Sequence, residues 1–159
     1  MSETANIHGT AIAVAGRAVL LRGKPGAGKS DLALRCLAVA AGPFANEAPM
    51  LIADDRVMAI AEAVGIRVYG PNVLRGLIEV RGIGIVHVPS VPSALLALVA
   101  DLVAPQAIAR MPEPRAPAII CGVEVPCISL APFEASAPLK LLLALAEQTG
   151  DATSMRKNT

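Results

Sequence analysis

The sequence predicts an α/β fold built around a phosphate-binding loop. Residues 23–30, Gly-Lys-Pro-Gly-Ala-Gly-Lys-Ser, match the pattern G-x-x-x-x-G-K-[ST] at every defined position. A short apolar run, residues 18–21, ends just before this segment, as a buried strand does. Residues 31–41 follow it with apolar side chains at helical spacing. Strand, glycine-rich loop and helix therefore occur in the order that a nucleoside triphosphate site requires.

Each position of the loop has a chemical reason. Gly23, Gly26 and Gly28 allow backbone conformations in which successive N–H groups turn inward around a phosphate. Lys29 would lie against the β- and γ-phosphates, and the Ser30 hydroxyl would coordinate Mg²⁺. The alternative is a Gly/Pro-rich turn between two core elements. The predicted nucleotide-binding residues are Gly23, Lys24, Pro25, Gly26, Ala27, Gly28, Lys29 and Ser30.

Length, composition and charge limit the classes of function. A chain of 159 residues with 54% apolar content suits one domain with a sizeable core. The formal net charge of +1 and the scarcity of aromatic residues, two Phe and one Tyr, exclude a typical nucleic-acid binder and a membrane-surface protein. Three cysteines without a C-x-x-C pair, and an N-terminus without a signal-peptide pattern, favour the cytoplasm. The longest apolar stretch, residues 94–104, is interrupted by Asp101 and is too short to span a bilayer.

The first third of the chain predicts a hairpin and a buried strand around the loop. Residues 7–14 form the first expected strand, residues 15–17 its turn, and residues 18–21 the strand that leads into the loop. After the helix, residues 42–49 are a breaker-rich connection. Residues 50–53 then predict a buried strand that ends at Asp54 and Asp55.

The rest of the chain predicts short strands and one more helix. Residues 57–68 alternate loosely, residues 70–72 are a turn, and residues 77–80 and 83–88 are β-prone runs. Residues 94–103 fit a strand and a buried helix equally well. Residues 106–117 predict a Pro-rich loop, and residues 118–130 are strand-like with a turn at Gly122. Ser136 is expected to cap a helix of roughly ten residues ending near Gly150. We expect one domain over residues 1–150 and a disordered tail over residues 151–159.

Acidic residues could complete a metal site beside the loop. Asp54 and Asp55 follow a strand next to the strand that feeds the loop, where such enzymes place a Mg²⁺ partner or a catalytic base. The alternative is a solvated Asp-Asp turn. Glu79 is a second candidate, although it could also lie on the outward face of a strand. His8 and His87 are isolated histidines, which are often structural.

These segments together resemble a known family. His8-Gly9, the loop of residues 23–30, residues 51–57 (Leu-Ile-Ala-Asp-Asp-Arg-Val) and residues 78–85 (Ile-Glu-Val-Arg-Gly-Ile-Gly-Ile) resemble the catalytic domain of HPr kinase/phosphorylase in order and spacing. This bacterial enzyme acts on a seryl residue of the phosphocarrier protein HPr. The resemblance covers residues 5–148. It implies a P-loop-containing, PEP-carboxykinase-like domain with a mixed β-sheet and flanking helices.

The resemblance also implies roles for individual residues. Lys29 would contact the phosphates of ATP, and Ser30 and Glu79 would hold Mg²⁺. Asp54 resembles the acid that takes the proton from the attacking seryl hydroxyl, with His8 nearby. Arg110 matches an arginine near the transferring phosphate. The implied activity is ATP-dependent phosphorylation of a seryl residue of HPr, which regulates carbohydrate and phosphotransferase-system metabolism.

Two departures from the family pattern change this expectation. The full-length family has an N-terminal domain that this sequence does not contain, so the chain resembles the short forms made of the kinase domain. The family's Arg/Pro/Gly-rich segment for the reverse dephosphorylation corresponds here to residues 130–137, which contain no arginine. We therefore expect a kinase and doubt the reverse reaction. The alternatives are a small-molecule kinase and an ATP-binding regulatory module without transfer activity. The family typically forms hexamers, so a homo-oligomer is a further expectation.

Overall fold

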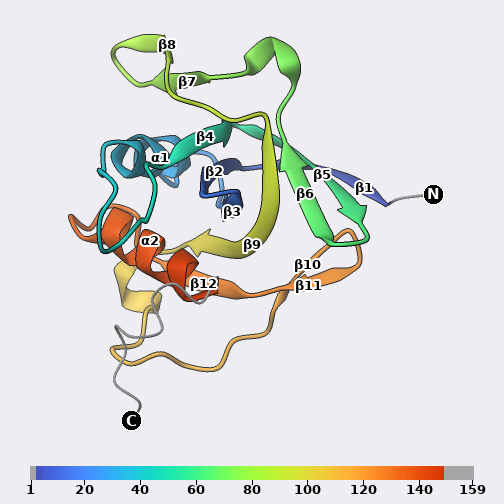
Figure 1. The fold of residues 1–159 in the computed structure, drawn as a ribbon. Coiled ribbons are helices and arrows are strands. Elements are labelled where there is room, and N and C mark those ends of the chain that lie inside the picture. The colour runs from blue at the N-terminus through green and yellow to red at the C-terminus, as the bar shows by residue number, and fades with distance from the viewer. Residues whose placement is uncertain (1–2, 149–159) are drawn as a thin grey trace.

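A computed structural model describes residues 3–148, and one mixed sheet of eight strands forms its centre (Figure 1). The strands in spatial order are β1 (Thr4–His8), β5 (Arg56–Glu62), β6 (Gly65–Tyr69), β9 (Ser93–Leu102), β3 (Arg17–Arg22), β2 (Thr10–Val14) and β4 (Met50–Ala53), with β12 (Cys127–Leu130) also paired to β9. The β3–β9 and β12–β9 pairs are parallel, and the other pairs are antiparallel. Two hairpins lie outside this sheet, β7 (Leu77–Val80) with β8 (Gly84–His87) and β10 (Ala118–Ile120) with β11 (Val123–Val125).

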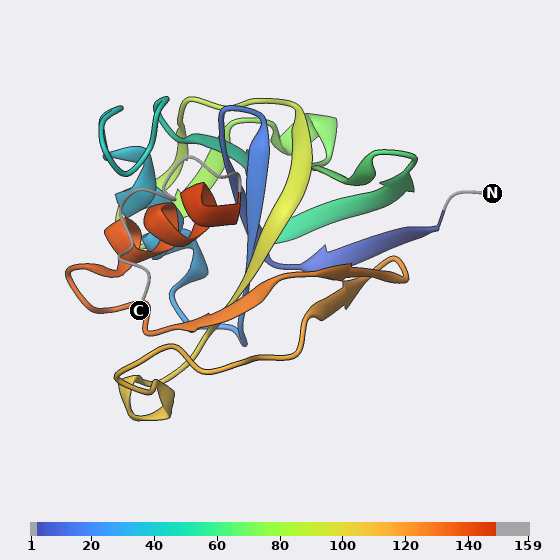
Figure 2. The ribbon, with the colours of Figure 1, turned by 60° about the horizontal axis from the view of Figure 1, so that its bottom comes forward.

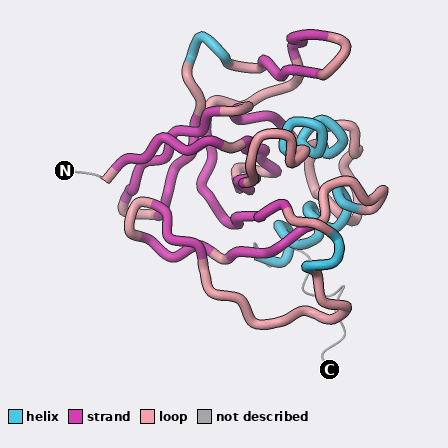
Figure 3. Tube along the Cα trace, turned by 180° about the vertical axis from the view of Figure 1, so that it is seen from behind, coloured by secondary structure: helices cyan, strands magenta, loops and turns pink. Residues whose placement is uncertain are grey.

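Both faces of the central strands are buried, each in its own hydrophobic cluster. The helices α1 (Lys29–Leu37) and α2 (Ala137–Gln148) pack side by side against one face (Figure 2), and Figure 3 shows from behind that both lie on the same side of the strands. Their cluster contains Leu21, Leu32, Leu98 and Leu141. The second cluster lies where β5, β6 and the β10–β11 hairpin cover the opposite face. A strand that is buried on both faces is a continuous apolar run in the sequence, and β3 could be predicted for this reason.

The predicted strand, loop and helix are confirmed, but the predicted strand over residues 7–14 is wrong. The segment forms two strands separated by Gly9, because β1 pairs with β5 while β2 pairs with β3 and β4. A Cβ atom on Gly9 would lie 2.7 Å from the carbonyl oxygen of Leu21, so only glycine allows this close crossing. The helix after the loop, α1, ends at Leu37 and is shorter than the predicted 31–41.

Strand pairing in the sheet also decides the secondary structure of the segments that the sequence left ambiguous. Residues 94–103 lie in β9, a strand with partners β6, β3 and β12. The alternating segment 57–68 is the β5–β6 hairpin, and residues 118–130 form three strands. Two 3₁₀ turns, η1 (Asn72–Leu74) and η2 (Pro105–Ala107), lie in the connections. The carbonyl of Ser136 accepts the first hydrogen bond of α2 from Lys140 at 2.9 Å, as a residue just before a helix does. The expected tail over residues 151–159 lies outside the described residues.

Candidate active site

The phosphate-binding loop connects the end of β3 to the start of α1. Gly26 and Gly28 have φ angles of 82° and 97°, in the left-handed region that favours glycine. Glycine is required at position 23 for a different reason: a Cβ atom there would lie 2.8 Å from the Cβ of Ala27. The N–H of Leu32 donates to the carbonyl of Gly28 at 2.9 Å, so the helix starts within the motif. The free N–H groups at this helix terminus favour an anion.

Lys29 is buried, with 7% of its surface exposed. Its ammonium group donates hydrogen bonds to the carbonyl oxygens of Gly23 at 2.7 Å and Lys24 at 3.2 Å. Among the ion pairs of residues 3–148, none involves Lys29. A buried cation that contacts only neutral carbonyls keeps its charge available for an incoming anion. This arrangement fits a triphosphate.

Asp54 lies at the end of β4 and is hydrogen-bonded on both carboxylate oxygens. Its Oδ1 accepts from the hydroxyls of Ser30 at 2.6 Å and Thr10 at 3.0 Å, and its Oδ2 accepts from the backbone N–H of Glu79 at 3.2 Å. Thr10 is fully buried, so this network is fixed by the core. Asp54 therefore joins the loop to the strand that carries the second predicted metal ligand. The sequence did not indicate the part played by Thr10.

Asp55, by contrast, faces the solvent. Its side chain is 79% exposed, and Oδ1 lies 2.7 Å from Nε2 of His8. The backbone of Asp55 has a φ angle of 68°, which is uncommon for a residue with a side chain and marks a strained turn. Consecutive residues point in opposite directions at the end of a strand. His8 is thus paired with the second acid, Asp55, and lines the same cavity as the loop.

A cavity of about 600 Å³ brings most of the predicted residues together. Its lining includes His8, Gly26, Gly28, Lys29, Ser30, Asp55, Glu79, Arg81 and Phe133, but not Asp54. Arg110 lies in the exposed loop after η2 and does not line this cavity. Residues 3–148 contain no group of three or more His, Cys, Asp or Glu side chains that could hold a metal. The hydroxyl of Ser30 and the carboxylate of Glu79 fit Mg²⁺ only together with water and phosphate oxygens, which is how Mg²⁺ is usually held in kinases.

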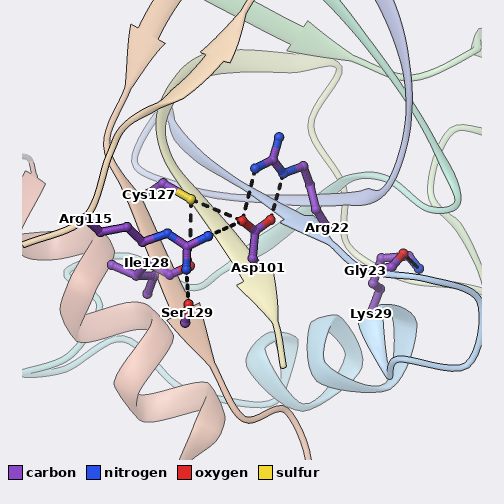
Figure 4. Close-up of polar contacts among 8 residues, drawn as sticks. All are labelled: Arg22, Gly23, Lys29, Asp101, Arg115, Cys127, Ile128 and Ser129. Carbon is purple, nitrogen blue, oxygen red and sulfur yellow. Dashed lines mark hydrogen bonds and ion pairs between the residues drawn. The ribbon is translucent and has the colours of Figure 1, made fainter. Parts of the chain in front are cut away.

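A second polar cluster lies beside the loop (Figure 4). Asp101 on β9 accepts a bidentate pair of hydrogen bonds from Arg22, at 2.8 and 3.1 Å, and a further one from Arg115 at 2.5 Å. Arg115 also donates to the hydroxyl of Ser129, and the thiol of Cys127 lies 3.4 Å from Asp101. Burial alone would raise the pKa of Asp101, but the hydrogen bonds and charge of Arg22 lower it on balance. Burial and the charge of Asp101 raise the pKa of Cys127.

The family model described as the HPr Serine kinase C-terminal domain matches residues 1–148. The chain belongs to this family. HPr kinase/phosphorylase of Bordetella pertussis is 35% identical over 92 residues, which are 57% of this chain and 27% of the relative. The enzyme of Lactobacillus delbrueckii subsp. bulgaricus is 37% identical over 92 residues, 55% of this chain and 26% of the relative. The match thus spans about a quarter of the relatives' length.

The solved structure of the Hpr(Ser) kinase/phosphatase from Coxiella burnetii has the same fold, with a TM-score of 0.73 at 23% identity. The match covers 95% of this chain and 93% of that one. The expected P-loop-containing, PEP-carboxykinase-like fold is therefore confirmed. No helix within residues 3–148 has the length and apolar character needed to cross a membrane.

Proposed function

We propose that this chain transfers the γ-phosphate of ATP to a seryl hydroxyl of HPr. The observation that carries the proposal is the buried ammonium of Lys29, which lies at the start of α1, next to a cavity that also contains Ser30 and Glu79. Membership of the HPr kinase family supports the activity, and its relatives' names support HPr as the acceptor. Phosphoryl transfer needs mainly positioning and charge neutralisation, which these residues can supply.

In this proposal, different groups of the protein bind the nucleotide and the metal ion. The loop N–H groups and Lys29 hold the phosphates, and Ser30 and Glu79 hold Mg²⁺. Mg²⁺ would neutralise charge on the β- and γ-phosphates when bound. Asp54 keeps the Ser30 hydroxyl in place through the 2.6 Å hydrogen bond. Arg110 stays a predicted partner of the transferring phosphate, and because it does not line the cavity, this role requires the loop after η2 to bring it there.

Two adjacent acids, Asp54 and Asp55, are candidates for the general base. Asp54 is the acid that the family resemblance favours, but its oxygens already accept three hydrogen bonds, as expected of a metal partner. Asp55 is exposed to the cavity and pairs with His8, so it can reach an incoming hydroxyl. We propose Asp54 as the base, and substitution of each acid by asparagine tests this assignment.

We also propose that the chain is a poor catalyst of the reverse reaction. The segment corresponding to the family's arginine-rich loop contains no arginine of its own. Arg35 of α1 does reach this segment, but its guanidinium is occupied by Asp31 and by the carbonyls of Pro132 and Glu134. A free phosphate would therefore find few cations there.

The test is incubation of the purified chain with ATP, Mg²⁺ and an HPr encoded in the same genome, followed by mass spectrometry. We expect one seryl phosphate on HPr. Labelling of a metabolite would favour a small-molecule kinase, and ATP binding without labelling would favour a regulatory module.

A cytoplasmic location and a homo-oligomer are further parts of the proposal, and light scattering of the purified chain checks the oligomer.

Lys29→Ala tests whether the loop binds the phosphates of ATP. It should weaken Mg²⁺–ATP binding about 10- to 150-fold, because hydrogen bonds from a charged donor are worth about 1.5–3 kcal/mol. The melting temperature should change little, because removal of a buried charge offsets the loss of the hydrogen bonds to Gly23 and Lys24. Arg17→Ala, which removes an exposed cation at the start of β3 outside the cavity, is the control and should change affinity far less. Unchanged affinity of Lys29→Ala in calorimetry would contradict the loop assignment.

A further inference from the structure

Phe133 is an exposed aromatic residue at the phosphate-binding loop. Its surface is 70% exposed, and it lines the cavity that contains Lys29 and Ser30. A Cβ atom on Gly28 would lie 2.9 Å from both Cε1 and Cζ of the ring, so the ring lies directly over the loop backbone. The chain has only two Phe, one Tyr and no Trp. An aromatic ring exposed at this place is not explained by core packing.

The segment that carries Phe133 is held from both sides. Arg35 of α1 donates hydrogen bonds to the carbonyl oxygens of Pro132 and Glu134, the two residues that flank Phe133. Its Nε also bonds Asp31 at 3.0 Å, and Lys140 of α2 pairs with the Glu134 carboxylate at 2.6 Å. The backbone around the ring is therefore fixed by both helices while the ring itself stays open to solvent. A preorganised apolar surface of this kind is a feature of ligand sites.

Sheet topology places this ring away from the acids. The loop follows β3, whose neighbour on one side is β2 and then β4, the strand that ends at Asp54 and Asp55. On the other side β3 is followed by β9 and β12, and Phe133 comes just after β12. The transferred phosphate must lie near the acids and the metal ligands, so the nucleoside end of the nucleotide extends towards the opposite side. Leu34, one turn after Ser30 and Asp31 on α1, lines the cavity as well and adds apolar surface.

We infer that Phe133 stacks on the nucleobase of the bound nucleotide and determines part of its affinity. The inference rests on the proposed function, because it takes the triphosphate to lie in the loop. Every base has a flat face on which an aromatic ring can stack, and such stacking typically changes affinity by about 5- to 150-fold. Phe133 thus binds the base, whereas Lys29 binds the phosphates.

The experiment compares two ligands that differ in the base. Mg²⁺–ATP and Mg²⁺–tripolyphosphate are titrated in a calorimeter into the wild-type chain, Phe133→Ala and Lys29→Ala. Phe133→Ala should weaken ATP binding at least 5-fold and leave tripolyphosphate binding within 2-fold of wild type. Lys29→Ala should weaken both. Ile119→Ala, which removes an exposed apolar side chain on β10 outside the cavity, is the matched control and should change neither.

Phe133→Trp provides a readout that does not depend on truncating the ring. Because the chain contains no other tryptophan, fluorescence of this variant reports the site alone. Mg²⁺–ATP should quench it, and Mg²⁺–tripolyphosphate should not.

The outcomes separate this inference from the proposed function. If the wild-type chain binds neither ligand, the proposed function fails. If it binds both and Phe133→Ala binds ATP as wild type does, the stacking inference is overturned while the proposed function stands. Equal weakening of ATP and tripolyphosphate in Phe133→Ala would also overturn it, because the ring would then act only on the shape of the loop at Gly28.

Discussion

At the residue scale, Glu79 carries the predicted metal dependence. Glu79 lines the same cavity as Ser30, and its backbone N–H donates a hydrogen bond to Oδ2 of Asp54 at 3.2 Å. Glu79→Gln keeps the size of the side chain but removes the negative charge that a hard cation needs. We expect the variant to require at least about 10-fold more Mg²⁺ for half-maximal transfer, with a melting temperature close to that of wild type.

A Mg²⁺ titration of the transfer rate checks this prediction. Glu124→Gln, an exposed acid on β11, is the control because it lies outside the cavity. Saturation of Glu79→Gln at the wild-type Mg²⁺ concentration would make Glu79 a surface acid of the β7–β8 hairpin.

The adjacent acids Asp54 and Asp55 give a second prediction at this scale. If Asp54 is the general base, Asp54→Asn should lower the transfer rate about 10²-fold or more at saturating ATP and Mg²⁺, with little change in ATP affinity. If Asp54 instead supports the metal through Ser30, affinity and rate should fall together, and extra Mg²⁺ should partly restore both.

Asp55→Asn is the matched substitution, and steady-state kinetics of both variants decides between the acids. The loss should be smaller at Asp55 if Asp54 is the base. A larger rate loss at Asp55, with unchanged ATP affinity, would transfer the role of base to the pair of Asp55 and His8, which lie 2.7 Å apart.

At the scale of elements, Asp101 connects three parts of the chain. It joins Arg22, the last residue of β3 before the loop, to Arg115 in the segment between η2 and β10. The same segment contains Arg110. Asp101 therefore anchors both the start of the nucleotide loop and the stretch that carries the predicted catalytic arginine. Asp101→Asn should lower the free energy of unfolding by about 1.5–3 kcal/mol at neutral pH, since hydrogen bonds to a charged group are lost.

This loss should depend on pH. The folded-state pKa of Asp101 is lowered, so its stabilising effect is complete above the unfolded-state pKa of about 3.9 and declines as the pH falls towards the folded-state pKa. The difference between wild type and Asp101→Asn in urea unfolding should thus shrink between pH 5 and pH 3. Glu62→Gln, which breaks the more exposed ion pair with Arg67, should cost less than about 1 kcal/mol. A difference independent of pH would contradict the ion-pair account.

At the scale of the whole molecule, β9 joins the two hydrophobic clusters. Leu98 lies fully buried in the cluster beneath the helices, and Val99 lies fully buried in the other. Truncation of one central side chain should therefore weaken the fold as a unit. Leu98→Ala should cost about 2–5 kcal/mol in urea unfolding, whereas Ile119→Ala, 61% exposed on β10, should cost less than about 0.5 kcal/mol. Separate transitions for the two clusters would show that they unfold independently.

Much of this fold could be predicted because its signals are local. The loop of residues 23–30 is defined by eight consecutive residues, and the runs that became β3 and β4 are buried on both faces. Residues 94–103 could not be assigned, because an apolar run of that length fits a helix or a strand until its hydrogen-bond partners are known. The break at Gly9 was missed for a similar reason, since it depends on the carbonyl of Leu21 in another strand.

The sequence by itself determined the nucleotide loop, the family and most of the residues in the cavity, because backbone conformation and charge within a short segment are enough to specify a phosphate site. Only the tertiary structure decided that His8 pairs with Asp55, which is 47 positions away, and that Asp54 holds Ser30. It alone placed Phe133 over Gly28 and joined Asp101 to Arg115. These contacts link strands and loops that are distant in the chain, and the pairing of the sheet, rather than any local pattern, brings them together.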